Sequence, residues 1–300
     1  MSSIDTILQE FRFERVLSHD TRTKLLFVLG QINGENCILS FEKSQYTDED
    51  IPQLACQTHG LTDITQNDIY GWASARITTV NPDTRVKIIY PATDLHIRKY
   101  EQQARFLIQE TPELFKMITW PYIQSLDPSR IQWVYNILEG KSEAERVIYR
   151  DTDPKTGFVI LPDMKWDGSK ESLYWVVIAA RDDIYSLRSL TPDHLDLLKN
   201  IRQRACQLAE EKFGLKQKQL RLFVHYQPSY YHFHVHVTAV SFADAPGVVA
   251  GQAHLLDTVI DNLQLMADYY QRATLPFVVG ERHPLCIAYQ AQEDGIERQE

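Results

Sequence analysis

The sequence predicts an α+β fold with a β-rich N-terminal part and a larger C-terminal part in which strands and helices are mixed. Two observations predict this class. Up to residue 91, runs rich in β-branched and aromatic residues are separated by short turn sequences, which is typical of antiparallel sheets. Beyond residue 111, similar runs are interspersed with segments of helical periodicity. With 300 residues, 44% of them hydrophobic, the chain can form one large domain or two modest ones.

The N-terminal part is predicted to contain two β-hairpins. The first joins residues 24–29 to residues 37–41 through Asn33-Gly34, because both central residues of a type I′ turn need positive φ. The second joins residues 76–80 to residues 85–90. This part contains no catalytic constellation, and we interpret it as scaffolding.

The spacing of the apolar residues changes at residue 95. Apolar residues fall at helical spacing over residues 95–110, and Pro112 ends the segment by preventing its continuation. The pattern predicts a single helix that connects the two parts of the chain.

The C-terminal part contains runs with the apolar character of buried strands. They lie at residues 146–149, 157–161, 173–180 and 220–226. Residues 131–138 are predicted to form a short amphipathic helical piece.

Two longer helices are also predicted. The first begins with Thr191 as N-cap and Pro192 at its first helical position, and it ends at Gly214. The second has an apolar face made of Leu255, Leu256, Val259, Ile260 and Leu263.

Residues 230–240 are dominated by aromatic and β-branched side chains, which predicts a strand whose successive side chains point to opposite faces. One face then carries three histidines, His232, His234 and His236. The other face carries Phe233, Val235 and Val237. The apolar face can attach the strand to a core, whereas a row of imidazoles is poor packing material. We therefore expect the histidines to have a chemical role.

Three interpretations of the histidine row are possible. A zinc site would need at least three protein ligands, and no Cys-x-x-Cys or His-Glu-x-x-His accompanies the row. A chance arrangement on a partly exposed strand is improbable with 10 histidines in 300 residues. The third is nucleophilic catalysis at phosphorus, for which an imidazole that is largely neutral near pH 7 is well suited. We favour the third.

The run His232 to Thr238 resembles the signature of the histidine-triad (HIT) superfamily, in which three histidines alternate with apolar residues. Further segments are similar to the scavenger mRNA decapping enzyme (DcpS) family, in the same order along the chain. They are residues 67–70, 90–93, 131–138, 161–166, 186–195 and 228–231.

The resemblance implies a C-terminal HIT-like domain at residues 112–300, with an antiparallel sheet and flanking helices. It implies a smaller β-rich domain at residues 1–94 and a hinge helix at residues 95–111. In DcpS-like proteins the N-terminal domain is exchanged between two subunits as a lid, so a domain-swapped homodimer is expected.

The resemblance also implies an m7GpppX diphosphatase, which hydrolyses the 7-methylguanosine cap of cap dinucleotide or short capped RNA. His234 would attack the phosphate next to 7-methylguanosine and form a covalent nucleotidyl-histidine. Water would then free 7-methylguanosine monophosphate. His232 and His236 would orient the nucleophile and stabilise the phosphate oxygens. Neither a metal nor another cofactor is expected.

The base would be recognised by Trp133 and Glu143, because a cationic purine is attracted to an aromatic face and to a carboxylate. Met164 would cover the other face of the base, where the family usually has leucine. On the residues alone, a single tryptophan on a helix is more often part of a core.

Five further residues are candidate substrate contacts. Asp163 and Lys165 would bind a sugar hydroxyl and a phosphate, although Asp and Lys are most often plain surface charges. Ser229 and Tyr230 lie in the turn before the histidine strand and could bind phosphate oxygens, although Ser is also a common turn residue. The resemblance implies a phosphate or ribose contact for His225, which as a lone histidine would more often be structural.

One position departs from the family. Before Ala253-His254 the family usually has an arginine that reaches the phosphates, whereas this chain has Gln252. A neutral amide is not equivalent to a guanidinium on a phosphate. Either phosphate binding is weaker, or Lys165 and the histidines carry more of it.

The formal net charge of −9 argues against a protein that binds long duplex nucleic acid through its phosphates. The four cysteines have no metal-like spacing and indicate free thiols in a reducing compartment. No signal-peptide pattern or membrane-spanning apolar run is present. We expect an intracellular protein, of the cytoplasm or also of the nucleus.

Two other functions remain open. A generic HIT hydrolase acting on dinucleoside polyphosphates or phosphoramidates would share His234 but would gain little from Trp133 and Glu143. A non-catalytic cap-binding protein would not need the intact histidine row.

Overall fold

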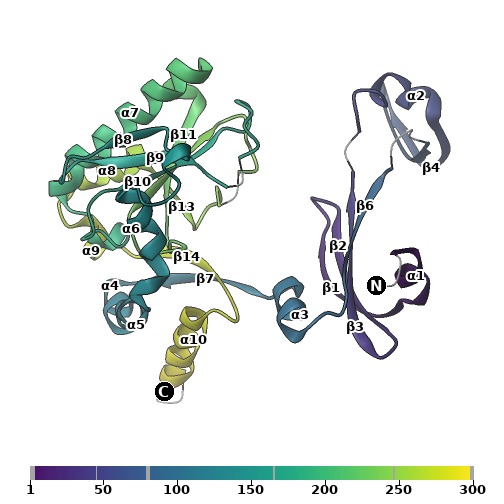
Figure 1. The fold of residues 1–300 in the computed structure, drawn as a ribbon, viewed down its shortest axis with the longest axis horizontal. Helices are drawn as coiled ribbons and strands as arrows, with labels where there is room; N and C mark the ends of the chain where they lie inside the picture. The colour runs from purple at the N-terminus through teal and green to yellow at the C-terminus, as the bar shows by residue number, and fades with distance from the viewer. Residues whose placement is uncertain (1–3, 45, 79–81, 165, 246, 298–300) are drawn as a thin grey trace. The chain divides into compact units, whose positions relative to one another are not determined.

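The computed structural model describes residues 4–44, 46–78, 82–164, 166–245 and 247–297. The chain divides after Gln103 into two compact units. Both units combine antiparallel sheets with helices, so the predicted α+β class is confirmed (Figure 1).

The N-terminal unit is built around an antiparallel sheet in the order β1-β2-β3-β6 (Figure 1). Its strands are β1 (Arg12–Asp20), β2 (Leu25–Ile32), β3 (Glu35–Lys43) and β6 (Thr84–Ile89). Its helical segments are α1 (Ile4–Glu10), η1 (Ile51–Gln53), α2 (Leu54–Gln57) and α3 (Asp94–Tyr100). Both faces of the sheet are buried, one against Ile97 of α3 and the other against Ile7 of α1.

The first predicted hairpin is confirmed. Strands β2 and β3 pair up to Ile32 and Glu35, and the two turn residues between them have φ of 52° at Asn33 and 84° at Gly34. These are the positive values that a type I′ turn requires.

The second predicted hairpin is wrong. Strand β6 pairs with β3, because its Ile88 and Ile89 complete the two apolar faces of the main sheet. The segment that ends at Ile77 belongs instead to a separate exposed ribbon of β4 (Thr58–Asn67) and β5 (Tyr70–Ile77). Residues 79–81 of the prediction lie outside the described residues.

The predicted connecting helix is correct only in its first half, where α3 ends at Tyr100. Residues 105–110 form strand β7 (Arg105–Glu110), which pairs with β14 (Leu275–Gly280) far along the chain. Within β7, Ile108 and Glu110 are buried while their neighbours are exposed, which is the two-residue alternation of a strand.

The C-terminal unit contains an antiparallel sheet in the order β13-β11-β12-β10-β9-β8. Figure 1 labels all of these strands except β12. Its strands are β8 (Tyr149–Asp151), β9 (Phe158–Pro162), β10 (Tyr174–Ala179), β11 (Leu220–His225), β12 (His234–Ala239) and β13 (Ala253–Leu255). The predicted strand at residues 146–149 is displaced, because Ala144–Arg146 forms a 3-10 turn and β8 begins only at Tyr149.

The long helices of this unit are α7 (Leu195–Phe213) and α8 (Leu256–Leu265). The first agrees with its prediction, since Thr191 and Pro192 begin the 3-10 turn η6 (Pro192–His194) that leads into it and Gly214 is its left-handed C-cap. In α8 the predicted apolar face holds except for Leu255, which precedes the helix and is exposed.

The remaining helical segments are short, except for α10 at the C-terminal end. They are α4 (Pro112–Leu114), the π-helix η2 (Phe115–Thr119), α5 (Trp120–Ser125), η3 (Pro128–Ile131), α6 (Gln132–Leu138), η4 (Ala144–Arg146), η5 (Leu187–Ser189), η7 (Gln217–Gln219), α9 (Tyr269–Arg272) and α10 (Pro284–Glu297). Among the described residues, no helix combines the length and the apolar character needed to cross a membrane.

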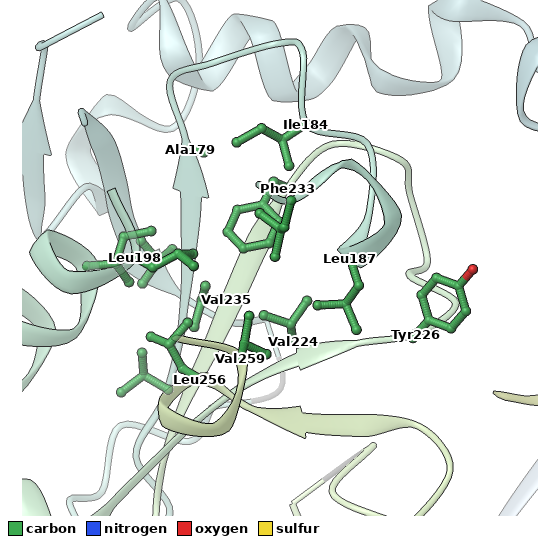
Figure 2. Packing of buried hydrophobic residues seen from close by; sticks show 14 of the residues in the cluster. Ala179, Ile184, Leu187, Leu198, Val224, Tyr226, Phe233, Val235, Leu256 and Val259 are labelled. Atoms are coloured by element: carbon green, nitrogen blue, oxygen red, sulfur yellow. The ribbon is translucent and has the colours of Figure 1, made fainter. Parts of the chain in front are cut away.

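The apolar side of the histidine strand packs as predicted. Phe233, Val235 and Val237 belong to the main core of the unit. Figure 2 shows Phe233 and Val235 near Val224 of β11, with Leu256 and Val259 of α8 beneath them. The regular strand is shorter than predicted and begins at His234. This packing holds β12 in the middle of the sheet.

Candidate active site

A pocket of about 600 Å³ lies in the C-terminal unit. Its wall includes eight of the residues singled out from the sequence, namely Trp133, Glu143, Asp163, Met164, His225, Ser229, Tyr230 and His236. Tyr174, Arg146, Gly247 and Gln252 also line it. We call this space the histidine pocket. Lys165 lies outside the described residues.

His234 lies behind the wall of this pocket rather than on it, with only 2% of its surface exposed. The aromatic ring of Tyr230 is stacked on its imidazole, with 4.1 Å between ring centroids and 16° between ring planes. Tyr230 in turn meets Trp133 edge to face at 4.9 Å. Tyr230, an expected phosphate contact, therefore covers His234, the expected nucleophile.

The hydrogen bonds of His234 define which ring nitrogen is available. Its Nδ1 lies 2.8 Å from the carbonyl oxygen of His232, and because a carbonyl can only accept, Nδ1 carries the proton and donates. In the neutral ring the lone pair is then on Nε2, which has no hydrogen-bond partner among the residues the structure describes.

The protonation state of His234 follows from its surroundings. Burial lowers the pKa of His234 to about 4, against the smaller opposing effect of the hydrogen bond to His232. The ring is therefore neutral near pH 7, with an unshared electron pair on Nε2. This is the state in which an imidazole acts as a nucleophile.

His236 is the histidine of the row that opens on the pocket. Its ring lies 5.1 Å from that of His234 and 4.3 Å from that of His225, measured between centroids. Its Nδ1 is hydrogen-bonded to the hydroxyl of Tyr174 at 3.2 Å. Burial, with a smaller contribution from Asp163, raises the pKa of Tyr174, so that hydroxyl stays protonated.

Sequence reasoning missed Tyr174, because its relation to His236 depends on the pairing of two strands. Tyr174 lies on β10, where Val176 is the partner of His236 in the register with β12. A residue two positions from a cross-strand partner shares its face, so Tyr174 is a diagonal neighbour of His236. Pairing between the two strands had to be known before this could be seen.

His232 precedes the regular part of β12, and its Nε2 donates to the carbonyl oxygen of Ala179 at 2.8 Å. Burial lowers the pKa of His232. Its ring contacts Tyr135 of α6 and does not line the histidine pocket. His232 therefore contacts His234 through its backbone carbonyl, which accepts the hydrogen bond from Nδ1 of His234.

His225 is held by a glycine. Gly247 has φ of 83°, and a Cβ placed there would lie 2.2 Å from Nε2 of His225. No side chain fits at that distance, so the backbone of the loop at residue 247 packs directly on the imidazole. Sequence reasoning missed Gly247 because the contact joins residues that are distant along the chain.

The pocket is also lined by the expected base contacts. Trp133 is 42% exposed, because α6 buries Val134 and Ile137 and turns Trp133 outward. Met164 is 88% exposed. Glu143 lies in a left-handed conformation, with φ of 53°, at the start of η4. The alternative interpretation of Trp133 as a core residue is therefore wrong.

A buried ion pair supports the loop that carries Ser229 and Tyr230. Glu110 and Arg188 are both buried and lie 3.0 Å apart. Glu110 also accepts from Gln227 Nε2 at 3.1 Å, at the start of this loop, and from the hydroxyl of Tyr226. Further donors come from Thr119 at 2.5 Å and Tyr289 at 3.0 Å. The contacts of Tyr226 and Gln227 attach the base of the loop to this buried network.

Metal ligation is a separate question for a row of histidines. In the part of the chain that the structure describes, no group of three or more His, Cys, Asp or Glu side chains is arranged to hold a metal ion.

The site thus combines an antiparallel sheet, alternating histidines on a central strand and a pocket with aromatic and acidic walls, as expected from the histidine-triad resemblance. Residues 6–103 match the family described as scavenger mRNA decapping enzyme (DcpS) N-terminal, and residues 132–247 match scavenger mRNA decapping enzyme C-term binding. The chain belongs to the scavenger mRNA decapping enzyme family, which confirms the resemblance noted from the sequence.

Curated relatives cover nearly the whole chain. The m7GpppX diphosphatase of Ascaris suum is 42% identical over 281 residues, which is 93% of both chains. That of Schizosaccharomyces pombe is 37% identical over 92% of this chain and 93% of its own. That of Homo sapiens is 39% identical over 92% of this chain and 83% of its own.

Proposed function

We propose that this protein is an m7GpppX diphosphatase that hydrolyses cap dinucleotide and short capped RNA fragments. The products are 7-methylguanosine monophosphate and a diphosphate-ended nucleotide or RNA. The observation that carries the proposal is the state of His234, a neutral imidazole whose Nδ1 proton is held by a carbonyl and whose Nε2 keeps its lone pair. The family and the relatives' activity support the same reaction.

The reaction proceeds in two displacements at one phosphorus. Nε2 of His234 attacks the phosphorus next to 7-methylguanosine, the anhydride P–O bond breaks, and its electron pair leaves with the diphosphate. Water then attacks the same phosphorus and the P–N bond breaks. The lone pair returns to Nε2, the hydroxyl remains on the phosphate, and the proton of the water is released.

The remaining pocket residues stabilise the charge on the phosphate oxygens. His236 and His225 line the pocket with rings in contact, and Ser229 and Tyr230 add hydroxyl donors. Because Tyr230 covers the ring of His234, its side chain turns aside when the triphosphate enters. Lys165 is proposed to contribute a positive charge next to Asp163, which would hold a sugar hydroxyl.

The cationic base occupies the outer end of the pocket. It stacks on Trp133, with Met164 over its other face, and its polar edge donates to Glu143. We further propose the family's swapped homodimer with an N-terminal lid, and a location in the cytoplasm or also in the nucleus.

The test uses purified full-length protein, cap dinucleotide and a metal chelator. The wild type should release 7-methylguanosine monophosphate, and His234→Asn should abolish hydrolysis while still binding the cap. His254→Asn is the matched control, because His254 is a half-buried histidine of the same sheet that does not line the pocket. Hydrolysis by His234→Asn at the wild-type rate would refute the mechanism.

The two rival functions give different results in the same assay. A generic HIT hydrolase would cleave methylated and unmethylated cap dinucleotide equally well. A non-catalytic cap-binding protein would bind without releasing product. The exposure of Trp133 beside Glu143 favours discrimination by methylation.

A further inference from the structure

Arg146 lines the histidine pocket but has no part in the mechanism described above. It lies at the end of η4, a single turn after Glu143. Its Nη1 forms a short ion pair with Oε2 of Glu143. Its Nη2 donates to the carbonyl oxygen of Pro162 at 3.1 Å. One guanidinium therefore joins two segments of the pocket wall.

Those two segments carry opposite sides of the proposed base site. Glu143 belongs to the segment that follows α6, which carries Trp133. Pro162 ends β9 and leads directly into Asp163 and Met164. Arg146 therefore connects the segment that carries Trp133 to the segment that carries Met164.

Glu143 needs such a support. Its side chain is 35% exposed, so burial does not fix its carboxylate, and its left-handed backbone is not part of a regular element that would orient it. Arg146 engages Oε2, while Oε1 has no hydrogen-bond partner among the described residues. The carboxylate is thereby held with one oxygen directed for use by a ligand.

We propose that Arg146 is a positioning residue that determines specificity for the cationic purine. It fixes the carboxylate of Glu143 and sets the width of the slot between Trp133 and Met164, without touching the base itself. The inference rests on the proposed function. The planar guanidinium of Arg146 is essential, because a lysine ammonium cannot hold a carboxylate and a backbone carbonyl in one plane.

The chain offers a matched control in Arg150. This arginine also donates to backbone carbonyls, those of Leu138 and Ile137, the latter at 2.9 Å. It lies outside the histidine pocket and attaches the end of α6 to β8. Replacing it removes a comparable set of hydrogen bonds without touching Glu143.

The experiment compares Arg146→Gln, Arg146→Lys, Arg150→Gln and Glu143→Gln in the full chain. Titration with 7-methylguanosine monophosphate measures the Kd, and cap dinucleotide with and without the methyl group measures kcat and KM. Both Arg146 variants should raise Kd and KM for the methylated ligand about tenfold or more, since the loss of a hydrogen bond to a charged group weakens an interaction by at least about that factor. They should change kcat much less and should reduce the preference for the methylated cap. Arg150→Gln should keep that preference.

Other results would overturn the inference in distinguishable ways. Wild-type Kd in both Arg146 variants, with a raised Kd in Glu143→Gln, would remove the role of Arg146 and leave the proposed function intact. Full preference for the methylated cap in Arg146→Lys would show that the planar guanidinium is not needed. A preference unchanged even in Glu143→Gln would refute the base site of the proposed function, and the inference with it.

Discussion

The ring of Tyr230 lies flat on the imidazole of His234, 4.1 Å from it, and the imidazole is buried beneath it. Burial is the main reason that the pKa of His234 is low, and Tyr230 supplies part of that burial. Under the proposed function the same side chain also contacts the phosphates, so Tyr230 would have two effects on catalysis that mutation can separate.

Replacing Tyr230 should shift the pH dependence of catalysis. In Tyr230→Ala, water reaches His234, so its pKa should rise from about 4 towards 6.5. The acidic limb of the profile of kcat/KM against pH should then move upward by about one to two pH units. Tyr230→Phe keeps the stacked ring and should leave that limb in place, while it lowers the rate through loss of the hydroxyl. An identical acidic limb in the alanine variant would contradict this account.

The low pKa of His234 also predicts how stability depends on pH. The unfolded chain, with a histidine pKa near 6.5, binds the proton more readily than the folded protein, with a pKa of about 4. The contribution of His234 to stability is therefore fully present above pH 6.5 and is lost as the pH falls towards 4. Between pH 7.5 and 4.5 this one group should lower the free energy of unfolding by about 2–3 kcal/mol. Urea denaturation of the wild type and His234→Asn at both pH values measures it, and an equal loss in the two proteins would contradict it.

Gly247→Ala should impair catalysis by moving His225. The new Cβ would lie 2.2 Å from Nε2 of His225, so the ring or the loop must shift away from His236. We expect kcat/KM to fall about tenfold or more, since small displacements in a catalytic site are costly. Gly214→Ala is the control, because Gly214 also has positive φ but its Cβ would meet nothing. Each variant should lose about 1–2 kcal/mol of stability because of its positive φ, Gly247→Ala should lose more because of the clash, and only Gly247→Ala should lose activity. Equal activities would refute the contact's importance.

Gln252→Arg should strengthen substrate binding. Gln252 lines the histidine pocket, and a guanidinium there can pair with phosphate oxygens where the amide cannot. The KM for cap dinucleotide should fall severalfold and should rise more steeply with ionic strength than in the wild type. Gln252→Lys is an informative companion, because a point charge should give part of the effect. An unchanged KM at low salt would place residue 252 out of reach of the phosphates.

Part of this molecule could be predicted because local residue patterns determine it. The alternation from His232 to Val237 specified which side chains face the core, and Asn33-Gly34 specified a turn by its backbone requirement. Thr191 and Gly214 similarly marked the ends of a long helix. Each of these signals acts within a few residues of the chain.

The wrong predictions concern features that depend on contacts between segments distant along the chain. Ile108 fits the face of a helix as well as that of a strand, and only its pairing with Phe277 makes the strand. The stacking of Tyr230 on His234 and the hydrogen bond between Tyr174 and His236 likewise depend on the register of assembled strands. The candidate residues could thus be named from the sequence. Their exposure to the pocket, the tautomers of the histidines and the hydrogen bonds that hold these side chains could not.

The carboxylate of Glu110 gathers donors from Thr119, Gln227 and finally Tyr289 in helix α10. One carboxylate therefore joins strand β7, the segment before the histidine strand and helix α10. Removing any one of these donors leaves the same buried carboxylate with one partner fewer, so a substitution as remote along the chain as Tyr289→Phe should act on the loop that carries Ser229 and Tyr230.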